Sequence, residues 1–389
     1  MANTKITNPK SFNLGASTSA TQLPVMTLTQ RTAMTGTIDG EMIFNSTTDK
    51  VEYWDGTKWY GITYETIPGE SPYNAVIWRG TGNTNVRTGV GFQPDLIWVK
   101  NRDVADSYAI VDSVRGIVLP QTPYIASNRT DAQASSANMP TSVQSDGFTI
   151  TGGGGRTNTN NEDYVAWCFK GGGAAVSNGY GSIASQVSAN VDGGFSIVKW
   201  SGNSSNASIG HGLNSAPEIV IRKNLISAAS WAVDTSAVDG SWDYLFLNTT
   251  AQKGNHPSIT APTSTTFNTS GTTYNSSSMI AYCFHSVPGY SKIGSYPGNG
   301  STNGPTVPLG FQPTFLMCKK TSGTGNWRIM DNTRQPSNPK SDGLWANLSN
   351  AESTSSSNLV DFNSDNFQLV GGGSDVNASG QTYMYLAFA

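Results

Sequence analysis

Charged residues are scarce in this sequence, and their scarcity excludes several classes of partner. Asp, Glu, Lys and Arg make up 13% of the 389 residues, and the formal net charge is −3. Proteins that bind nucleic acid or an anionic membrane surface need a basic stripe, which this composition does not supply. The sequence also lacks an apolar run long enough to cross a bilayer. We therefore expect no nucleic-acid partner and no membrane insertion.

Cysteine and histidine are also rare, with three of each. Cys168, Cys283 and Cys318 lie inside apolar segments, and their odd number and spacing fit neither a disulfide framework nor a zinc site. We expect them to be buried as small hydrophobic residues. The histidines are not at metal-ligand spacing either. Because no catalytic, cofactor-binding or metal-ligating residue stands out, we expect no enzyme, no cofactor and no bound metal.

The segment Met1–Gly15 lacks the apolar core of a signal peptide. If the protein works outside a cell, we expect it to leave as part of a released particle and not through the general secretory route.

What the sequence does contain is a repeat. Three segments of about a hundred residues end in nearly the same hexapeptide, and repetition at a fixed period indicates a modular architecture. The closing hexapeptides are Tyr164–Phe169 (YVAWCF), Met279–Phe284 (MIAYCF) and Tyr383–Phe388 (YMYLAF). Other landmarks recur in the same order, among them a lone phenylalanine at Phe148, Phe267 and Phe367. The closing hexapeptides alternate large and small apolar residues, which predicts a central strand that is covered on both faces.

These patterns predict an all-β protein with little helix. We expect three tandem β-sandwich or jelly-roll-like repeats, at residues 73–170, 194–289 and 290–389, preceded by a small β-hairpin module. The glycine-rich residues 171–193 between the first two repeats have the composition of a linker. We therefore expect the repeats to fold independently of one another.

One polar feature recurs with the repeats. Each repeat has an aspartate followed by a small polar residue, at Asp112, Asp234 and Asp331. We interpret these aspartates as residues that close turns by bonding to the backbone, with calcium ligation as the alternative.

The N-terminal part has a different composition. Residues 1–22 form a polar arm, residues 23–62 a compact β-hairpin module, and residues 63–72 a linker. Asp55-Gly56 between alternating apolar residues predicts a hairpin turn. So short a module cannot bury Trp54, Trp59 and Tyr60 by itself, so we expect these rings to be attachment anchors.

Both parts resemble known modules. The segment LPVMTLTQRTAMTGTIDGEMIFNSTTDKVEYWDGTKWYGI is similar to a short module of tail-fibre and other structural proteins of bacteriophages, particularly marine ones. The repeats, with GFQPDLIWVK, SDGFTI and YVAWCF, resemble a module of the same kind of virion protein. The resemblance implies a phage virion structural protein, assembled in the host cytoplasm. A homotrimeric tail fibre or adhesin is the first interpretation. A head or collar decoration protein and a free carbohydrate-binding protein are the alternatives.

For the fibre interpretation we expect two contact regions. Residues 1–62 would bind other virion proteins, and the third repeat would touch a host surface glycan. Trp345 lies between the serine-rich segments 337–342 and 351–358, which makes it a candidate receptor contact. As the counterpart of Phe246 in the second repeat, it is first of all a candidate core residue.

Overall fold

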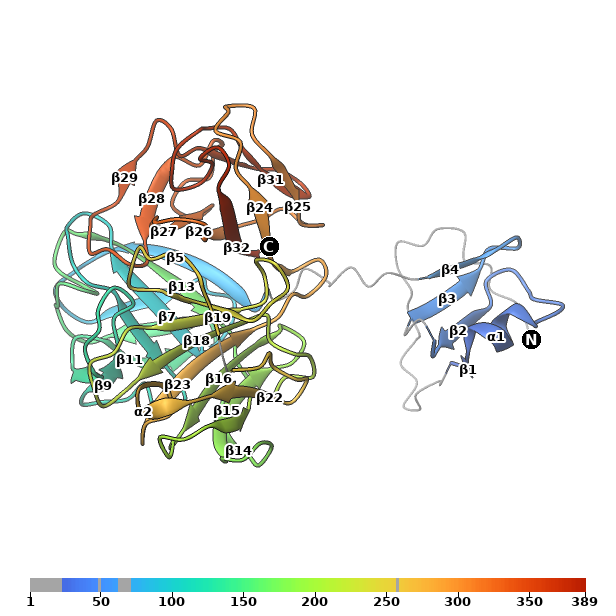
Figure 1. The fold of residues 1–389 in the computed structure, drawn as a ribbon, viewed down its shortest axis with the longest axis horizontal. Coiled ribbons are helices and arrows are strands. Elements are labelled where there is room, and N and C mark those ends of the chain that lie inside the picture. Colours follow the sequence, from blue (N-terminus) through green and yellow to red (C-terminus); the bar gives the residue numbers. More distant parts are fainter. Residues whose placement is uncertain (1–22, 48–49, 62–70, 257–258) are drawn as a thin grey trace. The chain divides into compact units, whose positions relative to one another are not determined.

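A computed structural model describes residues 23–47, 50–61, 71–256 and 259–389 (Figure 1). The chain divides into two compact units, Met1–Gly69 and Glu70–Ala389, which we call the N-terminal unit and the body. Helices contain 3% of the residues and strands 41%, so the expected all-β class is confirmed. In the described part of the chain, no helix combines the length and the apolar character that crossing a membrane requires.

In the N-terminal unit, the described residues 23–47 and 50–61 form a four-stranded sheet with one short helix. Its strands follow the order β1-β2-β3-β4, with β1 parallel to β2 and the other pairs antiparallel. The strands are β1 (Val25–Met26), β2 (Met42–Asn45), β3 (Lys50–Trp54) and β4 (Trp59–Gly61). The predicted turn closes because Asp55 Oδ1 accepts hydrogen bonds from the backbone N–H groups of Thr57 and Lys58, each 2.8 Å away. Gly56 supplies the required positive φ, at 93°.

The helix of this unit was not among the expected elements. α1 (Leu28–Thr32) begins at a capping box, in which the Thr27 side chain accepts from the Gln30 N–H and the Gln30 side chain accepts from the Thr27 N–H. A helix this short shows no periodic pattern of apolar residues. Its only signal in the sequence is the Thr-x-x-Gln spacing of the capping box.

The body contains the three repeats, and each is built from short strands. The first repeat comprises β5 (Tyr73–Arg79), β6 (Asn85–Thr88), β7 (Leu96–Asn101), β8 (Ala109–Asp112), β9 (Thr122–Tyr124), β10 (Ala134–Ser136), β11 (Pro140–Gln144), β12 (Gly147–Ile150) and β13 (Asp163–Phe169). The second comprises β16 (Phe195–Trp200), β17 (Ala207–Gly210), β18 (Ile219–Asn224), β19 (Ala232–Thr235), β20 (Asp243–Phe246), β21 (Gly254–Asn255), β22 (Thr266–Thr269), α2 (Gly271–Tyr274) and β23 (Met279–Phe284). The third comprises β24 (Ser291–Pro297), β25 (Thr306–Pro308), β26 (Phe315–Lys320), β27 (Trp327–Asp331), β28 (Asp342–Trp345), β29 (Ser353–Thr354), β30 (Val360–Phe362), β31 (Asn366–Leu369) and β32 (Thr382–Phe388).

The same strand order recurs in the three repeats. Each has a main sheet, in the orders β5-β13-β7-β8, β16-β23-β18-β19 and β24-β32-β26-β27, and the closing hexapeptide is always an inner strand. Each also has a smaller sheet, in the orders β6-β12-β11, β17-β22 and β25-β31-β30. The main sheets of different repeats do not merge. All of these sheets are open, and a jelly-roll topology stays a prediction.

Each main sheet packs one face against its own smaller sheet. The lone phenylalanine of every repeat lies edge-on to an aromatic ring of the first main strand, with centroids 5.5–5.8 Å apart. The three pairs are Phe148 with Trp78, Phe267 with Trp200 and Phe367 with Tyr296. The repeated phenylalanine therefore has the same core position in each repeat.

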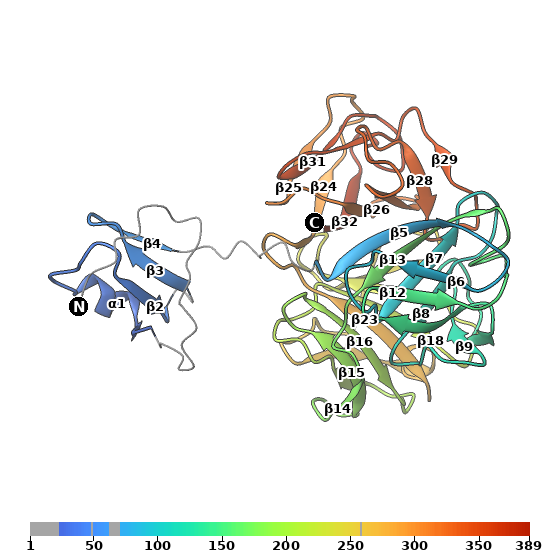
Figure 2. The ribbon, with the colours of Figure 1, turned by 180° about the vertical axis from the view of Figure 1, so that it is seen from behind.

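The opposite faces of the three main sheets meet in one common core. Its buried side chains come from all three repeats, and Figures 1 and 2 show the repeats gathered around the centre of the body. Phe169, Phe284 and Phe388, the last residues of the three hexapeptides, form a triangle with centroid separations of 5.8, 5.3 and 6.0 Å. The three-residue contact marks a pseudo-threefold centre within a single chain.

This common core corrects the expectation of independent repeats. The segment 171–193, which has the composition of a linker, contains β14 (Val176–Asn178) and β15 (Ser185–Asn190). β15 pairs with β16 along its whole length, so the segment extends the main sheet of the second repeat. Small polar residues gave these two strands the appearance of a connector. The repeats are coupled through the shared core.

Candidate functional site

The three predicted anchors of the N-terminal unit lie on different faces of its sheet. Trp54 and Trp59 are cross-strand partners, half-buried, with ring centroids 5.6 Å apart. Tyr60 lies on the opposite face, stacked on Tyr53 at 5.5 Å with 18° between the ring planes. The sequence reasoning grouped Tyr60 with the two tryptophans and missed Tyr53. The period of two along a strand would have separated them.

The tryptophan face carries a buried polar network. On this face Ile43, Asn45 and Glu52 are all buried, with 0%, 0% and 4% of their surface exposed. Glu52 accepts from the Arg31 guanidinium of α1 at 2.6 Å and from the Asn45 amide at 3.0 Å. α1 therefore lies over this face and satisfies its charge. These residues were not among the predicted site residues.

The other face of the same sheet is apolar and exposed. Tyr53 and Tyr60 are 37% and 38% exposed, and Val25 is 58% exposed. We call this the open face; its residues are Val25, Met42, Phe44, Val51, Tyr53 and Tyr60. In an antiparallel sheet with one solvated face, that face is usually polar. Here the more exposed face is apolar.

In the body, two of the three repeated aspartates close turns as predicted. Asp112 accepts from the backbone N–H of Arg115 at 2.8 Å and from its Nε at 2.6 Å. Asp331 makes the same two contacts with Arg334, at the same distances. Asp234 differs, because it pairs with Arg222 at 2.5 Å and with His256 at 2.7 Å. Within the described ranges, no group of three or more acidic, histidine or cysteine side chains is placed to hold a metal.

The aspartates also join neighbouring repeats. Tyr282 of the second repeat donates its hydroxyl to Asp112 of the first at 2.7 Å. Trp167 of the first repeat donates its indole N–H to Asp331 of the third at 2.9 Å. Tyr282 and Trp167 occupy the same position of the closing hexapeptide. The sequence showed that these positions repeat, but not that they reach across to the next repeat.

A second set of hydrogen bonds and an ion pair also join neighbouring repeats, in the same order around the body. Trp231 of the second repeat donates to the Ala126 carbonyl of the first at 2.9 Å, and Trp327 of the third donates to the Phe246 carbonyl of the second at 3.0 Å. Arg102 of the first repeat pairs with Glu352 of the third at 2.6 Å. The second repeat thus contacts the first, the third contacts the second, and the first contacts the third. These contacts join the three repeats in a closed ring.

Three equivalent lysines are buried near these seams. Lys100, Lys223 and Lys319 have no exposed surface, and burial lowers the pKa of each to about 8. Their ammonium groups donate to backbone carbonyls. Lys223 reaches the Thr130 carbonyl of the first repeat at 3.1 Å, and Lys319 reaches the Thr250 carbonyl of the second at 3.3 Å. Lys223 and Lys319 therefore link repeats, whereas Lys100 donates to the Asn101 and Val104 carbonyls of its own repeat.

Trp345, the predicted receptor contact, lies at the end of β28 and is half-buried. Its indole N–H donates to Asp375 at 2.9 Å, and the Arg328 guanidinium lies 5.5 Å from its ring centroid. One ring face and the polar edge are thus occupied within the third repeat. A receptor role for Trp345 stays a prediction.

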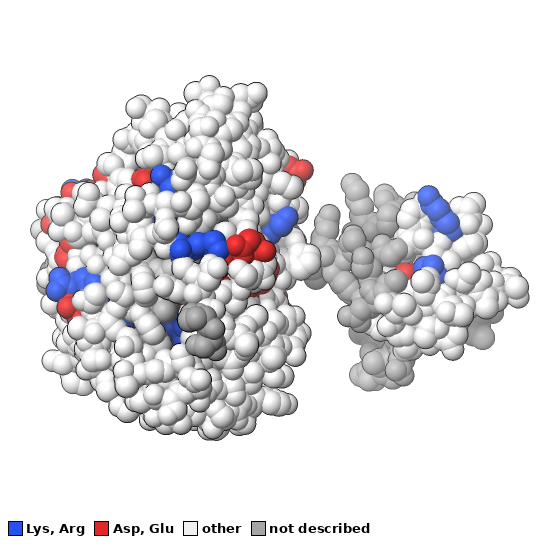
Figure 3. All heavy atoms as spheres, viewed as in Figure 1, with Lys and Arg blue, Asp and Glu red and all other residues white. Residues whose placement is uncertain are grey.

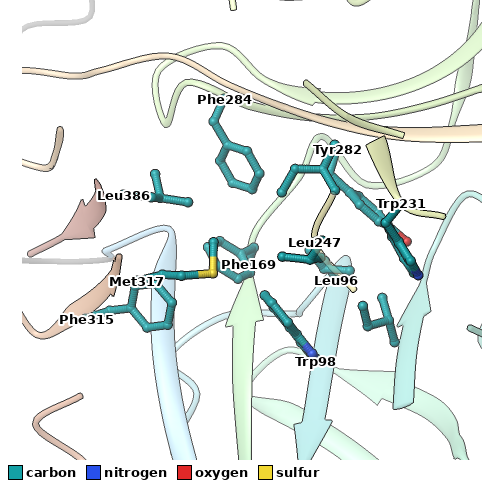
Figure 4. Close-up of a pocket in the computed structure, with 12 residues that line it drawn as sticks. Leu96, Trp98, Phe169, Trp231, Leu247, Tyr282, Phe284, Phe315, Met317 and Leu386 are labelled. Atoms are coloured by element: carbon teal, nitrogen blue, oxygen red, sulfur yellow. The ribbon is translucent and has the colours of Figure 1, made fainter. Parts of the chain in front are cut away.

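The common core contains a small apolar cavity of about 30 Å³ (Figure 4). Side chains from all three repeats line it, including Phe169, Phe284, Phe315 and Leu386. Its size is that of about one water molecule, and its walls offer no polar partner, so it is a packing gap and not a ligand site.

Two larger hollows open on the surface around the second repeat, and both contain several neutral polar side chains. One, of about 400 Å³, is lined by Gln186, Lys199, Ser201, Ser277 and Ser278 among others. The other, of about 300 Å³, includes Ser182, Asn206, Ser208, Thr260 and Asn268. Tyr180, only two residues before Ser182, is 64% exposed. These hollows were not predicted, because their residues are distant in the sequence.

Comparison with known families covers nearly the whole chain. Residues 69–389 match a family described as a domain of unknown function, DUF7483. The chain belongs to the DUF7483 family. Residues 3–81 match a phage tail-like trimerisation region. Comparisons with curated proteins and with solved structures returned no match.

The trimerisation region supports a phage tail-type structural protein that forms a homotrimer and is a component of the virion. It overlaps the N-terminal unit, whereas the DUF7483 match coincides with the body.

Proposed function

We propose that this protein is a tail fibre or adhesin that takes part in host adsorption. The observation that carries the proposal is the order of the two family matches, a phage tail-like trimerisation region followed by the DUF7483 body. In this proposal residues 1–62 bind other virion proteins during assembly in the host cytoplasm, and the three β-sandwich repeats of each chain are displayed to the host surface. The protein acts by binding and has no enzymatic activity.

The construction of the body suits display. Its three repeats share one core and are joined in a ring by hydrogen bonds and ion pairs, such as Arg102 with Glu352 at 2.6 Å. The ionisable side chains at the seams are engaged in these contacts: Asp112 and Asp331 bind arginines, and Lys223 binds carbonyls. These groups therefore hold the repeats together and do not form an open catalytic cluster.

The body surface supports a neutral polar ligand. Charged side chains are few and scattered on the face shown in Figure 3. The hollow lined by Ser182, Ser208 and Asn268 offers hydroxyl and amide groups, and Tyr180 adds an exposed ring nearby. Sugars present hydroxyls on their edges and apolar C–H faces, which such a combination binds. We therefore assign a host surface glycan as the receptor class.

An adsorption assay tests the role. Full-length protein added to host cells before the phage should compete for receptors and slow adsorption, and antibodies against the body should do the same. Particles that lack the protein should adsorb poorly. Normal adsorption of such particles would overturn the adhesin role and leave decoration of the head or collar.

A glycan array tests the ligand class. Full-length protein should bind host polysaccharide, and Tyr180→Ala should weaken binding at least several-fold if the ring stacks on a sugar. Ile77→Ala is a matched control, because Ile77 is a 45% exposed apolar side chain of the first repeat, distant in sequence from the hollow. Absence of binding to any host polysaccharide would overturn the glycan assignment.

A further inference from the structure

The open face of the N-terminal sheet has the composition of an interface. Burial alternates along β2, so that Ile43 and Asn45 are buried while Met42 and Phe44 are only half-buried. The same alternation places buried Glu52 beside exposed Tyr53 on β3. The side chains of these strands that turn away from α1 are therefore all apolar, whereas the α1 face combines apolar Ile43 with the polar side chains of Asn45 and Glu52. A contiguous exposed apolar patch on a soluble protein marks a surface that another molecule covers.

The chemistry of this face points to a second copy of the same surface. The six residues of the open face carry no charge, so identical faces can approach one another without repulsion between like charges. Tyr53 and Tyr60 are stacked at 5.5 Å and provide rigid aromatic area, a residue type enriched at interface hot spots. A polar rim is present as well, because Lys58 lies 4.7 Å from the Tyr60 ring centroid.

We propose that the open face is the contact through which three copies of this chain assemble. The argument for this occupant is the position of the face inside the segment that matches a phage tail-like trimerisation region, residues 3–81. The inference rests on the homotrimer of the proposed function and adds the surface that forms it. The main sheets of the body are a poorer choice, because the chain covers both of their faces itself.

Substitution of the open face in the full-length chain tests the proposal. Val25→Lys and Tyr53→Lys each place a charge on the open face, three times over in a trimer. Both should convert the trimer to monomer when mass is measured by light scattering or native mass spectrometry. Val176→Lys is the matched control, because Val176 is 65% exposed, close to the 58% of Val25, but lies on β14 of the body. The control should remain trimeric.

Cross-linking distinguishes a lost interface from a misfolded unit. The three native cysteines are buried, so a new surface thiol is the reactive one. Tyr53→Cys should give covalent dimers of chains with a short bifunctional maleimide, because its copies would lie close together around the threefold axis. Thr29→Cys, an exposed position on α1 at the far side of the sheet, should not.

The outcomes separate this inference from the proposed function. A wild-type protein that is monomeric overturns both the homotrimer and the open face as its contact. A wild-type trimer that survives Val25→Lys and Tyr53→Lys, and in which Tyr53→Cys does not cross-link, overturns the open face alone. The face would then be covered by residues 1–22 or by another virion protein.

Discussion

In the body, both faces of each main sheet are covered by side chains of the same chain, whereas the described residues of the N-terminal unit bury only the face of its sheet that lies under α1. The body achieves this by bringing three repeats together, so that Phe169, Phe284 and Phe388 meet at its centre. The N-terminal sheet has a single copy of its apolar face per chain, with Tyr53 and Tyr60 exposed.

The two units differ in whether the surface that covers an apolar sheet face belongs to the same chain or to another chain. The body carries three versions of one unit in a single sequence, so its threefold arrangement closes intramolecularly. The N-terminal unit carries one version, so a threefold arrangement needs three chains. Contacts within one chain do not depend on protein concentration, but contacts between chains do. The two units should therefore respond differently to mutation, pH and dilution.

The largest effect is expected from a residue of the common core. Trp167 is fully buried, and its N–H binds Asp331 of the third repeat at 2.9 Å. Trp167→Ala should lower the free energy of unfolding by about 3 to 5 kcal/mol. Because the core is shared, all three repeats should melt together at a lower temperature in calorimetry. If the first repeat melted alone and the other two were unchanged, the repeats would be independent and the shared core would not couple them.

A smaller effect is expected from pH, through the three buried lysines. Burial lowers the pKa of Lys100, Lys223 and Lys319 from 10.5 to about 8. Between these two values the unfolded chain binds more protons than the folded one, so the free energy of unfolding should rise as the pH increases from about 8 towards 10. Well below pH 8, the cost of burying the ammonium groups is fully present.

Urea denaturation of the body at pH 7.5 and pH 9.5 measures this dependence. Buried thiols and phenols oppose the lysines, because burial raises the pKa of Cys168, Cys283 and Cys318 above 9.0 and that of tyrosines such as Tyr282. These groups make stability fall as the pH rises above about 9, so they reduce the rise that the lysines cause. Lys223→Met should reduce the rise between the two pH values, and the triple Lys→Met variant should abolish it. If the free energy of unfolding of the triple variant rose with pH as much as that of the wild type, the lysines would not be the cause of the rise.

The smallest effect is expected at the seam that closes the ring. Glu352 binds Arg102 at 2.6 Å and also Arg334, and its side chain is 14% exposed. Glu352→Gln should lower the free energy of unfolding by about 1 to 3 kcal/mol, as expected for hydrogen bonds to charged groups. Asp163→Asn is the control, because the Arg79–Asp163 pair is long, at 3.3 Å, and open to solvent. It should cost about 0 to 1 kcal/mol. Equal effects would mean that the seam adds no more than a surface ion pair.

The elements of the body could largely be predicted from the sequence, because the cues are local. The closing hexapeptides alternate large and small apolar residues, and they are inner strands in all three repeats. The turn-closing role of Asp112 and Asp331 follows from residue type and position. The buried state of Cys168, Cys283 and Cys318 follows from their apolar surroundings.

The relation between the repeats could not be predicted in the same way. Sequence similarity shows that Trp167 and Tyr282 are equivalent, but it does not show that each binds an aspartate of another repeat. The glycine-rich segment also misled the prediction, because β14 and β15 are made of small polar residues. In the N-terminal unit, the number of aromatic residues predicted an exposed aromatic surface. Which of these rings lie on the more exposed face, the two tyrosines or the two tryptophans, follows only from the register of β3 and β4.

The central claim is that threefold closure occurs within one chain in the body and between chains in the N-terminal unit. Sedimentation equilibrium of residues 71–389, compared with the full-length protein, tests it most directly. The account predicts that residues 71–389 are folded and monomeric at every concentration, because their main-sheet faces are already covered, while the full-length chain is a trimer. A trimer of residues 71–389, or an unfolded fragment, would contradict the account.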